Sequence, residues 1–300
     1  MKKRELGTSG MLISELGLGC MSLPKDRHEV VEVVATALDS GITFFDTADL
    51  YENGANEELV GHAIKNHRKD IILATKVGNE MNPDGKTWHW NASKQHITEG
   101  VKASLSRLGT DYIDLYQLHG GTMEDNVDEV IEAFDQLKRE GIIREYGISS
   151  IRPNVIQRFL SKSAAVSVMM QYNMLDRRPE EWFPLLESNG ASIVARGTLA
   201  KGLLTAEGKE RVNKLDSFVA VEQPELGDII KKLTSSSTNL HAAAIQFALR
   251  NDRIVTTLVG ARTREQLTDS LHAYEIGYEG LQLDELIKLL PLHNYEQHRI

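Results

Sequence analysis

Cysteine is nearly absent from this chain, because Cys20 is the only one among 300 residues. A single cysteine cannot form an intrachain disulfide, which is typical of proteins that work in a reducing compartment. A secretory signal is also missing, since the basic first residues are not followed by an apolar run. We therefore expect a cytoplasmic protein.

Long apolar runs and an excess of positive charge are missing too. No stretch reaches the roughly 20 apolar residues that a membrane-spanning helix needs. The formal net charge of −9 disfavours broad attraction to nucleic acid or anionic lipid, although it is compatible with one local basic pocket for a phosphate. We expect no nucleic-acid or membrane partner, and the sequence leaves the oligomeric state open.

What the chain does contain is a regular alternation of two kinds of segment. Short runs rich in Val, Ile, Leu and Phe are typical of buried strands, and longer segments with apolar residues at helical spacing lie between them. The eight predicted strands span residues 15–19, 42–46, 71–76, 112–119, 142–149, 167–171, 192–195 and 254–259. The predicted helices span residues 28–40, 56–67, 93–108, 126–140, 223–234, 239–250, 263–274 and 283–290, and two more begin at Pro153 and Pro179.

This alternation predicts a parallel sheet covered by helices, and eight units fit a closed (β/α)8 TIM barrel better than an open sheet. Residues 4–15 place Gly-Thr-Ser-Gly between two short apolar runs, which predicts a β-hairpin that caps the bottom of the barrel. No Gly/Ser linker or charge block divides the chain, so we expect residues 1–300 to form a single domain. Residues 205–222 are predicted to form one long loop, a feature that usually has a function.

Polar residues end three consecutive predicted strands. These residues are Asp46, Lys76 and His119, and Tyr51 lies in the loop that follows Asp46. Because barrel enzymes carry their active sites at the carboxyl ends of the strands, we expect the four side chains to share one site. Asp46 would pair with a buried Lys76, and the ammonium would lower the pKa of Tyr51 so that it can act as a general acid. Any one such residue is more often structural, but the four together predict catalysis.

The motifs around these residues resemble those of the aldo-keto reductase family. Residues 44–51, Phe-Phe-Asp-Thr-Ala-Asp-Leu-Tyr, are similar to its signature with the catalytic Asp and Tyr, and residues 74–76, Ala-Thr-Lys, are similar to its lysine strand. Residues 104–119 are similar to its longest signature, and the resemblance extends from residue 16 to residue 262. Within that family, the chain resembles the bacterial branch that is related to the reductase-like β subunits of channels. The resemblance implies catalytic residues Asp46, Tyr51, Lys76 and His119 and NAD(P)H-dependent reduction of a small carbonyl substrate.

The resemblance also implies a nicotinamide cofactor that lies across the barrel mouth. No G-x-G-x-x-G follows a predicted strand, so a Rossmann domain is not indicated. In this family the ends of the fifth and sixth strands hold the carboxamide, and the loop after the seventh holds the pyrophosphate. The helix start after the eighth strand suits a phosphate. The predicted cofactor-binding residues are Cys20, Met21, Ser149, Ser150, Gln171, Arg196, Gly197, Leu199, Lys201, Gly260, Arg262, Gln266 and Ser270.

Coenzyme choice is predicted from Arg262 and Gln266, which share one face of a helix start at i, i+4 spacing. A guanidinium can bind the 2′-phosphate with two hydrogen bonds, so we expect NADP(H) in preference to NAD(H). Arg196 departs from the family pattern, because an aromatic ring usually stacks on the nicotinamide there, although a planar guanidinium can also stack. Ser150 and Ser270 stand where asparagines are common, which leaves open whether they replace those contacts.

The substrate pocket is predicted at the same mouth, where His119 would orient the carbonyl oxygen. Two tryptophans follow Lys76 in a loop, and aromatic side chains there suit a carbonyl substrate. Surface packing is the alternative for the tryptophans, and ordinary packing is an equally good explanation for Cys20 and Met21. The predicted substrate residues are Met21, Tyr51, Trp88, Trp90 and His119.

Three other functions would explain part of the pattern. A sensor or regulatory module of the same fold would bind the cofactor with little turnover, but the complete tetrad favours turnover. A lyase would use Lys76 as a Schiff-base nucleophile, and a neighbouring Asp46 would hold that amine charged and unreactive. A metal-dependent hydrolase would need more His or carboxylate ligands at strand ends, so we expect no metal. The predicted reaction is reduction of an aldehyde or ketone to an alcohol by hydride transfer, with Tyr51 as the general acid.

Overall fold

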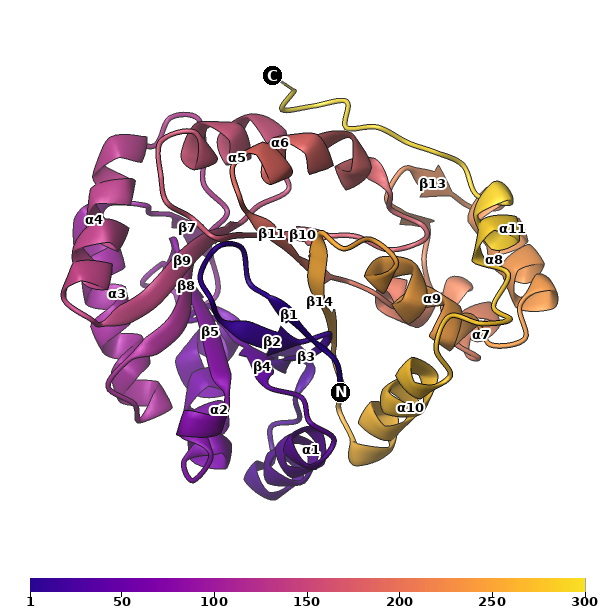
Figure 1. Ribbon diagram of the computed structural model, residues 1–300, viewed down its shortest axis with the longest axis horizontal. Helices are drawn as coiled ribbons and strands as arrows, with labels where there is room; N and C mark the ends of the chain where they lie inside the picture. Colours follow the sequence, from indigo (N-terminus) through magenta and orange to yellow (C-terminus); the bar gives the residue numbers. More distant parts are fainter. Residues whose placement is uncertain (300) are drawn as a thin grey trace.

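The computed structural model describes residues 1–299 and shows a barrel of parallel strands inside a ring of helices (Figure 1). Each strand pairs in parallel with the next, and the last pairs with the first. The predicted (β/α)8 barrel is therefore confirmed. In chain order, the barrel strands are β3 (Leu16–Gly19), β4 (Phe44–Asp46), β5 (Ile72–Val77), β8 (Ile113–His119), β9 (Ile143–Ser149), β10 (Ser167–Gln171), β11 (Ser192–Arg196) and β14 (Ile254–Val259).

The helices pack their apolar faces on the outside of the barrel. In α4, for example, Val130, Phe134 and Leu137 recur at helical spacing and all three are buried. The α-helices are α1 (Arg27–Asp39), α2 (Ala55–Ile64), α3 (Lys94–Leu108), α4 (Val127–Arg139), α5 (Pro153–Leu160), α6 (Phe183–Ser188), α7 (Gly208–Val212), α8 (Glu225–Ser236), α9 (Leu240–Leu249), α10 (Arg264–Glu275) and α11 (Leu283–Lys288). The 3-10 helices are η1 (Cys20–Ser22), η2 (Tyr51–Gly54), η3 (Arg68–Asp70), η4 (Arg178–Trp182) and η5 (Ala200–Gly202).

A β-hairpin closes the bottom of the barrel, as the sequence predicts. Strands β1 (Lys3–Glu5) and β2 (Leu12–Ser14) pair antiparallel, and Figure 1 shows them crossing in front of the barrel strands. Leu6 and Ile13 are fully buried and pack with Phe44, Leu115 and Met169, which belong to the barrel strands. The hairpin thus supplies apolar side chains that fill the end of the barrel opposite the site described below.

Three segments differ from the sequence prediction. Residues 205–222 are not one loop, because they contain α7 and a small sheet of β12 (Ser217–Phe218) and β13 (Val221–Glu222). Pro179 lies in η4, and the α-helix begins later, at Phe183. A further hairpin of β6 (Asn79–Met81) and β7 (Trp88–Trp90) follows β5 and was not predicted. These elements have two to six residues, too few for apolar periodicity to reveal them.

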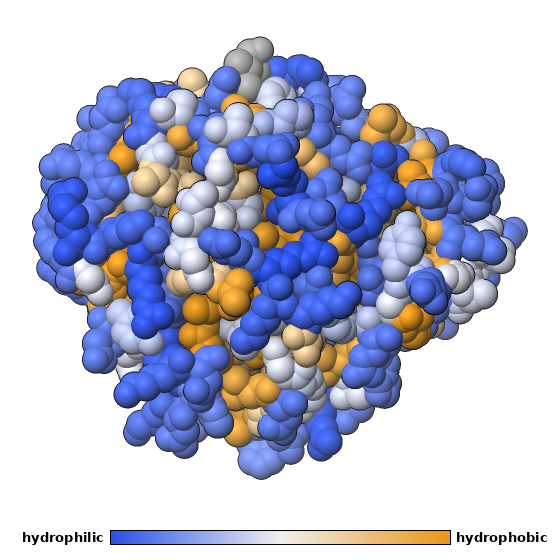
Figure 2. All heavy atoms as spheres, viewed as in Figure 1, coloured by the Kyte–Doolittle hydropathy of each residue, from blue (hydrophilic) through white to orange (hydrophobic). Residues whose placement is uncertain are grey.

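The outer surface in the view of Figure 1 is mainly hydrophilic. Figure 2 shows hydrophobic residues there only in small patches between hydrophilic ones. Among residues 1–299, every helix is too short or too polar to cross a bilayer.

Candidate active site

The four residues predicted at the strand ends and the following loop meet at one side of the barrel mouth, where Lys76 is the centre of their contacts. The Lys76 ammonium donates to Asp46 Oδ2 at 2.7 Å, to the Thr47 carbonyl at 2.8 Å and to the Tyr51 hydroxyl at 3.2 Å. The other Asp46 oxygen accepts from Gln117 Nε2 at 3.3 Å. Each ammonium proton thus has an acceptor, which offsets the cost of burying a side chain that is 1% exposed.

The charge of Lys76 is stabilised by its neighbours. Burial alone would lower the pKa of Lys76, but Asp46 and Tyr51 outweigh burial and raise that pKa above its usual value. A lysine that stays protonated is a poor nucleophile, which argues against the Schiff-base lyase. It is well suited to stabilise negative charge on the Tyr51 oxygen.

Tyr51 begins the turn η2, which is supported from below by a buried ionic network. The left-handed Gly54 (φ 90°) packs on Arg107, so closely that a Cβ at position 54 would lie 2.7 Å from Arg107 Cδ. Arg107 Nε donates to the fully buried Glu57 at 2.7 Å, and Thr75, the neighbour of Lys76, donates to the same carboxylate at 2.5 Å. The network therefore links the turn that carries Tyr51 to the strand that carries Lys76.

His119 ends β8 and faces Tyr51 edge to face, with ring centroids 6.2 Å apart. Burial, with Lys76 and Arg196 nearby, lowers the pKa of His119 to about 3, so its imidazole is neutral at physiological pH. Its Nδ1 is buried and has no hydrogen-bond partner among residues 1–299. A neutral imidazole can hydrogen-bond a substrate oxygen but is a poor source of a proton.

The unpredicted β6–β7 hairpin carries both tryptophans of the predicted substrate pocket. The Trp88 and Trp90 rings meet edge to face with centroids 4.9 Å apart, and both are partly exposed. The Trp90 ring lies directly against Gly120, the residue after His119, where no Cβ would fit. Arg152 lies 5.5 Å from the centre of the Trp90 ring. The structure therefore brings Trp90 beside the residue that follows the catalytic histidine candidate, while Met21, 66% exposed, lies in η1, directly after β3.

The residues predicted to hold the nicotinamide lie at the ends of β9, β10 and β11. Ser149 and Ser150 are buried there, and the Ser150 hydroxyl accepts from the backbone N–H of Arg152 at 3.2 Å. Gln171 and Arg196 are in contact, because Arg196 Nη1 donates to Gln171 Oε1 at 3.3 Å. Cys20, by contrast, is fully buried, and its side chain packs in the core, where burial raises the pKa of the thiol.

The predicted pyrophosphate loop after β11 has an unusual backbone. Ala200, Lys201 and Gly202 are all left-handed, with φ of 48°, 59° and 82°, and such conformations in non-glycine residues are costly and gather at functional sites. Arg211 of α7 packs on Gly202, where a Cβ would lie 2.7 Å from Arg211 Cδ. Among residues 1–299 the Arg211 guanidinium forms no ion pair, so it is a free cation beside this loop. The sequence does not single out Arg211, because it is one of 34 Lys and Arg residues and its place beside this loop depends on the fold.

The start of α10 holds the residues predicted to bind the adenosine phosphate. Gln266 Oε1 accepts from the backbone N–H of Arg262 at 2.9 Å, and the Thr263 hydroxyl caps the helix by accepting from the N–H of Gln266 at 3.3 Å. The Arg262 side chain is exposed at this helix N-terminus. Ser270 is buried, with its hydroxyl 3.2 Å from Nε2 of His241, so it faces α9.

Together these residues fit a nicotinamide dinucleotide. The exposed Arg262 at a helix N-terminus suits one phosphate, and Lys201 with Arg211 suits the pyrophosphate. Gln171 and Arg196 lie at the mouth near the tetrad. Gly260 leaves room for close packing of η1, because a Cβ there would lie 2.6 Å from the Ser22 hydroxyl.

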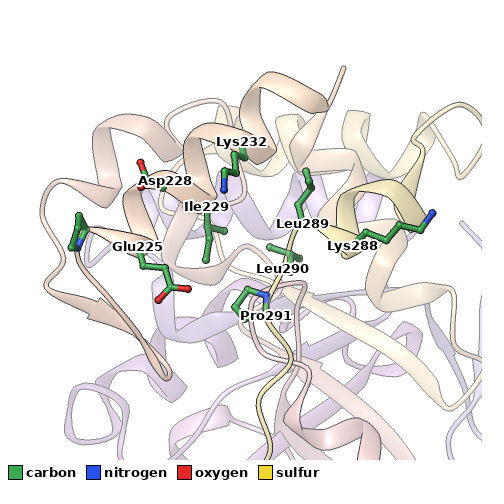
Figure 3. Close-up of a pocket in the computed structure, with 9 residues that line it drawn as sticks. Glu225, Asp228, Ile229, Lys232, Lys288, Leu289, Leu290 and Pro291 are labelled. Atoms are coloured by element: carbon green, nitrogen blue, oxygen red, sulfur yellow. The ribbon is translucent and has the colours of Figure 1, made fainter.

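A separate cavity of about 520 Å³ lies between α8 and the residues that end and follow α11 (Figure 3). Ile229, Leu289 and Leu290 form its apolar wall, with charged side chains such as Lys232 and Glu225 around them. None of the predicted site residues lines this cavity. Among residues 1–299, no group of three or more His, Cys, Asp or Glu side chains is arranged to hold a metal ion.

Known proteins resemble this chain over all or most of its length. It is 47% identical to the uncharacterized oxidoreductase YqkF of Bacillus subtilis, over 100% of both chains. It is 28% identical to the NADH-specific methylglyoxal reductase of Escherichia coli, over 92% of this chain and 94% of that protein.

A solved structure and a family profile agree with these relatives. The holo form of aldo-keto reductase AKR11C1 from Bacillus halodurans superimposes with a TM-score of 0.92 at 48% identity, and its apo form with 0.83 at 45%, each over 100% of both chains. The profile of the aldo/keto reductase family matches residues 15–290. The chain therefore belongs to the aldo/keto reductase family, and it is an oxidoreductase of a family that uses nicotinamide cofactors.

Proposed function

We propose that this protein reduces aldehydes or ketones to alcohols, with NADPH as the preferred reductant and Tyr51 as the proton donor. The observation that carries the proposal is the buried Lys76 ammonium, which contacts Asp46 and the Tyr51 hydroxyl at once. The ammonium lies within hydrogen-bond distance of the tyrosine oxygen, the atom that would carry the negative charge once the proton has been given away.

Each residue of the tetrad has a distinct part in the proposed reaction. The reduced nicotinamide, when bound, supplies the hydride that the carbonyl carbon accepts. Tyr51 gives its proton to the carbonyl oxygen as negative charge develops there, and Lys76 stabilises the tyrosine oxygen. Asp46 keeps Lys76 charged and in place. His119, neutral and beside Tyr51, holds the carbonyl oxygen in position by a hydrogen bond.

The proposed NADPH site extends from the mouth to α10. Gln171, Ser149 and Ser150 would hold the carboxamide, with Arg196 stacked on the ring. Lys201 and Arg211 would meet the pyrophosphate. The exposed Arg262 would meet the 2′-phosphate, which is the basis for proposing NADPH, whereas the relative from Escherichia coli is described as specific for NADH.

The substrate is proposed to bind between the tetrad and the β6–β7 hairpin. Trp90 beside His119, with Trp88 and Met21 at the rim, would form an apolar wall that favours substrates with apolar substituents. We further propose that the chain acts as one domain in the cytoplasm. The support for one domain is that a single large cluster of buried residues connects segments from residue 16 to residue 290.

The test is a panel of aldehydes and ketones with NADPH and NADH, followed by the absorbance of the reduced cofactor. We expect turnover by the wild type and loss of nearly all turnover in Tyr51→Phe, with cofactor affinity kept, because this variant loses one hydroxyl and little volume. The exposed Tyr278→Phe is the matched control. More than a tenth of wild-type turnover in Tyr51→Phe would show that another group donates the proton, and binding without turnover by the wild type would favour a regulatory module.

A further inference from the structure

The side-chain amide of Gln171 is held by two partners of opposite kind. Its Nε2 donates to Asp176 Oδ2 at 2.8 Å, and its Oε1 accepts from Arg196 Nη1 at 3.3 Å. A carboxylate only accepts hydrogen bonds and a guanidinium only donates them. Of the two amide orientations, which exchange the oxygen and the nitrogen, only one satisfies both partners. The Gln171 carbonyl oxygen is therefore directed toward Arg196, on the side of the barrel mouth.

Asp176 is itself rigidly placed. Its side chain is fully buried and receives two hydrogen bonds from Arg178, at 2.8 and 2.9 Å. Its backbone forms a bridge with Asn173, whose side chain donates to the carbonyl of Gly197 at 2.8 Å in the loop after β11. The carboxylate therefore has little freedom to turn away from Gln171.

The C-terminal segment, residues 289–299, covers the outer side of the Asp176–Arg178 ion pair. Figure 1 shows it running from α11 past α6 toward α5. Tyr295 is 6% exposed, and its ring centre lies 4.7 Å from the Arg178 guanidinium. Arg299 fastens the segment by binding Glu181 at 3.2 Å and the Tyr295 carbonyl at 2.8 Å. The Tyr295 ring thus shields from water the ion pair that holds Gln171.

We propose that Asp176 is a positioning residue for the nicotinamide, which acts through Gln171 and is kept in place by Arg178 and Tyr295. The inference rests on the proposed function, because it takes Gln171 as the residue that contacts the carboxamide. With its oxygen directed to the mouth, Gln171 is an acceptor for the carboxamide NH₂, and this decides which way round the carboxamide lies. Without Asp176 the Gln171 amide could rotate by half a turn, and a fraction of the protein molecules would then present the amide NH₂, a donor, to the carboxamide.

The experiment exchanges the two partners and measures the dissociation constant of NADPH by quenching of protein fluorescence. Asp176→Asn should weaken binding about tenfold, and Gln171→Glu should weaken it at least as much, because two carboxylates would face each other. The double variant Gln171→Glu/Asp176→Asn should recover part of the affinity and bind NADPH at least about threefold more tightly than the weaker single variant. In it the new amide at position 176 can donate to the new carboxylate at position 171, which still presents an acceptor to Arg196. Recovery should be incomplete, because Asp176 Oδ2 also accepts from Arg178 Nη2 and an amide nitrogen in its place cannot. Asp128→Asn, on the outer face of α4, is the matched control.

The outcomes separate this inference from the proposed function. A wild type that binds no nicotinamide cofactor overturns the proposed function. If the wild type binds NADPH, two results would overturn the positioning role alone. One is a dissociation constant of Asp176→Asn within twofold of wild type. The other is a double variant that binds NADPH no more tightly than the weaker single variant.

A second variant covers the case in which Asp176→Asn does not fold. Tyr295→Ala should weaken NADPH binding several-fold, and Leu292→Ala, exposed in the same segment, should not. Equal affinities of these two variants would overturn the part assigned to Tyr295, and thermal unfolding curves identify any variant that has lost its fold.

Discussion

Lys76 and His119 show how individual side chains are tuned at this barrel mouth. Lys76 carries a charge that is buried yet fully hydrogen-bonded, and His119 is held neutral by burial and by the charge of Lys76. The same ammonium therefore contacts the Tyr51 hydroxyl on one side and disfavours positive charge on His119 on the other. In the proposed reaction, this one buried cation thus serves both the proton donor, Tyr51, and the neutral hydrogen-bonding group, His119.

The neutral state of His119 makes the stability of the protein depend on pH. The pKa of His119 is lowered from 6.5 to about 3 in the folded protein, so below pH 6.5 the unfolded chain binds the proton more readily. The free energy of unfolding should therefore fall as pH decreases from about 6.5 to about 3, and His119→Gln should show a shallower fall. Urea unfolding at several pH values measures this, with the exposed His28→Gln as the control. Equal pH slopes for wild type and His119→Gln would contradict the assignment.

Arg262 decides coenzyme choice in our proposal. Arg262→Ala should lower the ratio of NADPH to NADH affinity about ten- to hundredfold, because a charge-assisted contact to the 2′-phosphate is lost. Dissociation constants of both cofactors measure the effect, and Arg264→Ala, at the same helix start, is the control. A wild type without preference, or an equal loss for both cofactors in Arg262→Ala, would rule out this role.

At the scale of elements, the β6–β7 hairpin is the addition that shapes the candidate substrate pocket. Its strand β7 carries both Trp88 and Trp90, and the missing Cβ of Gly120 lets the Trp90 ring lie against the residue that follows His119. Asn91 donates to Glu80 across the hairpin, at 2.5 Å, which helps to hold it closed. The elements of the barrel position the tetrad, while in our proposal this exposed hairpin limits which substrates can reach it.

Trp90→Ala should therefore change the order in which substrates are preferred more than it changes cofactor affinity. We expect the largest loss in kcat/KM, about tenfold or more, for carbonyls with bulky apolar groups, because these lose the most apolar contact. The panel of carbonyls provides the measurement, and Tyr278→Ala, far from the mouth and exposed, is the control. A uniform loss for all carbonyls would indicate damage to folding or to the cofactor site.

At the scale of the whole molecule, stability and chemistry are placed at opposite ends of the barrel. Asp114, near the start of β8, is fully buried and binds Arg68 at 2.8 Å, Arg144 at 2.9 Å and the backbone N–H of Leu73. These partners come from η3, β9 and β5, so one carboxylate joins neighbouring units of the barrel. The tetrad lies at the opposite, carboxyl ends of the strands, so the stabilising ion pairs and the candidate active site occupy different ends of the barrel.

Asp114→Asn should lower the free energy of unfolding by about 3 kcal/mol, because it removes the fully buried charge that pairs with the partly buried Arg68. Turnover at a temperature where the variant is folded should stay near that of wild type. Chemical unfolding and a single-substrate assay measure the two quantities, with the exposed Asp111→Asn as the control. A loss below about 0.5 kcal/mol would show that Asp114 does not join these units.

The sequence by itself determined the barrel and the gathering of Asp46, Tyr51, Lys76 and His119. The reason is that apolar runs and helical periodicity are local signals, and parallel strands in a barrel must bring their carboxyl ends to one face. The predicted strands agree with the observed ones to within two residues at each end. The short elements α7 and β6–β7 escaped prediction because no periodicity fits in a few residues.

Tertiary structure alone decided which distant side chains meet. Asp176 and Tyr295 are 119 residues apart in the chain (295 − 176), yet both contact Arg178, and nothing in their local sequence indicates it. Arg211 likewise reaches the loop at Gly202 only because α7 folds back on it. Local propensities specify elements, whereas such contacts depend on the packing of the complete chain, and the roles proposed for these residues depend on that packing.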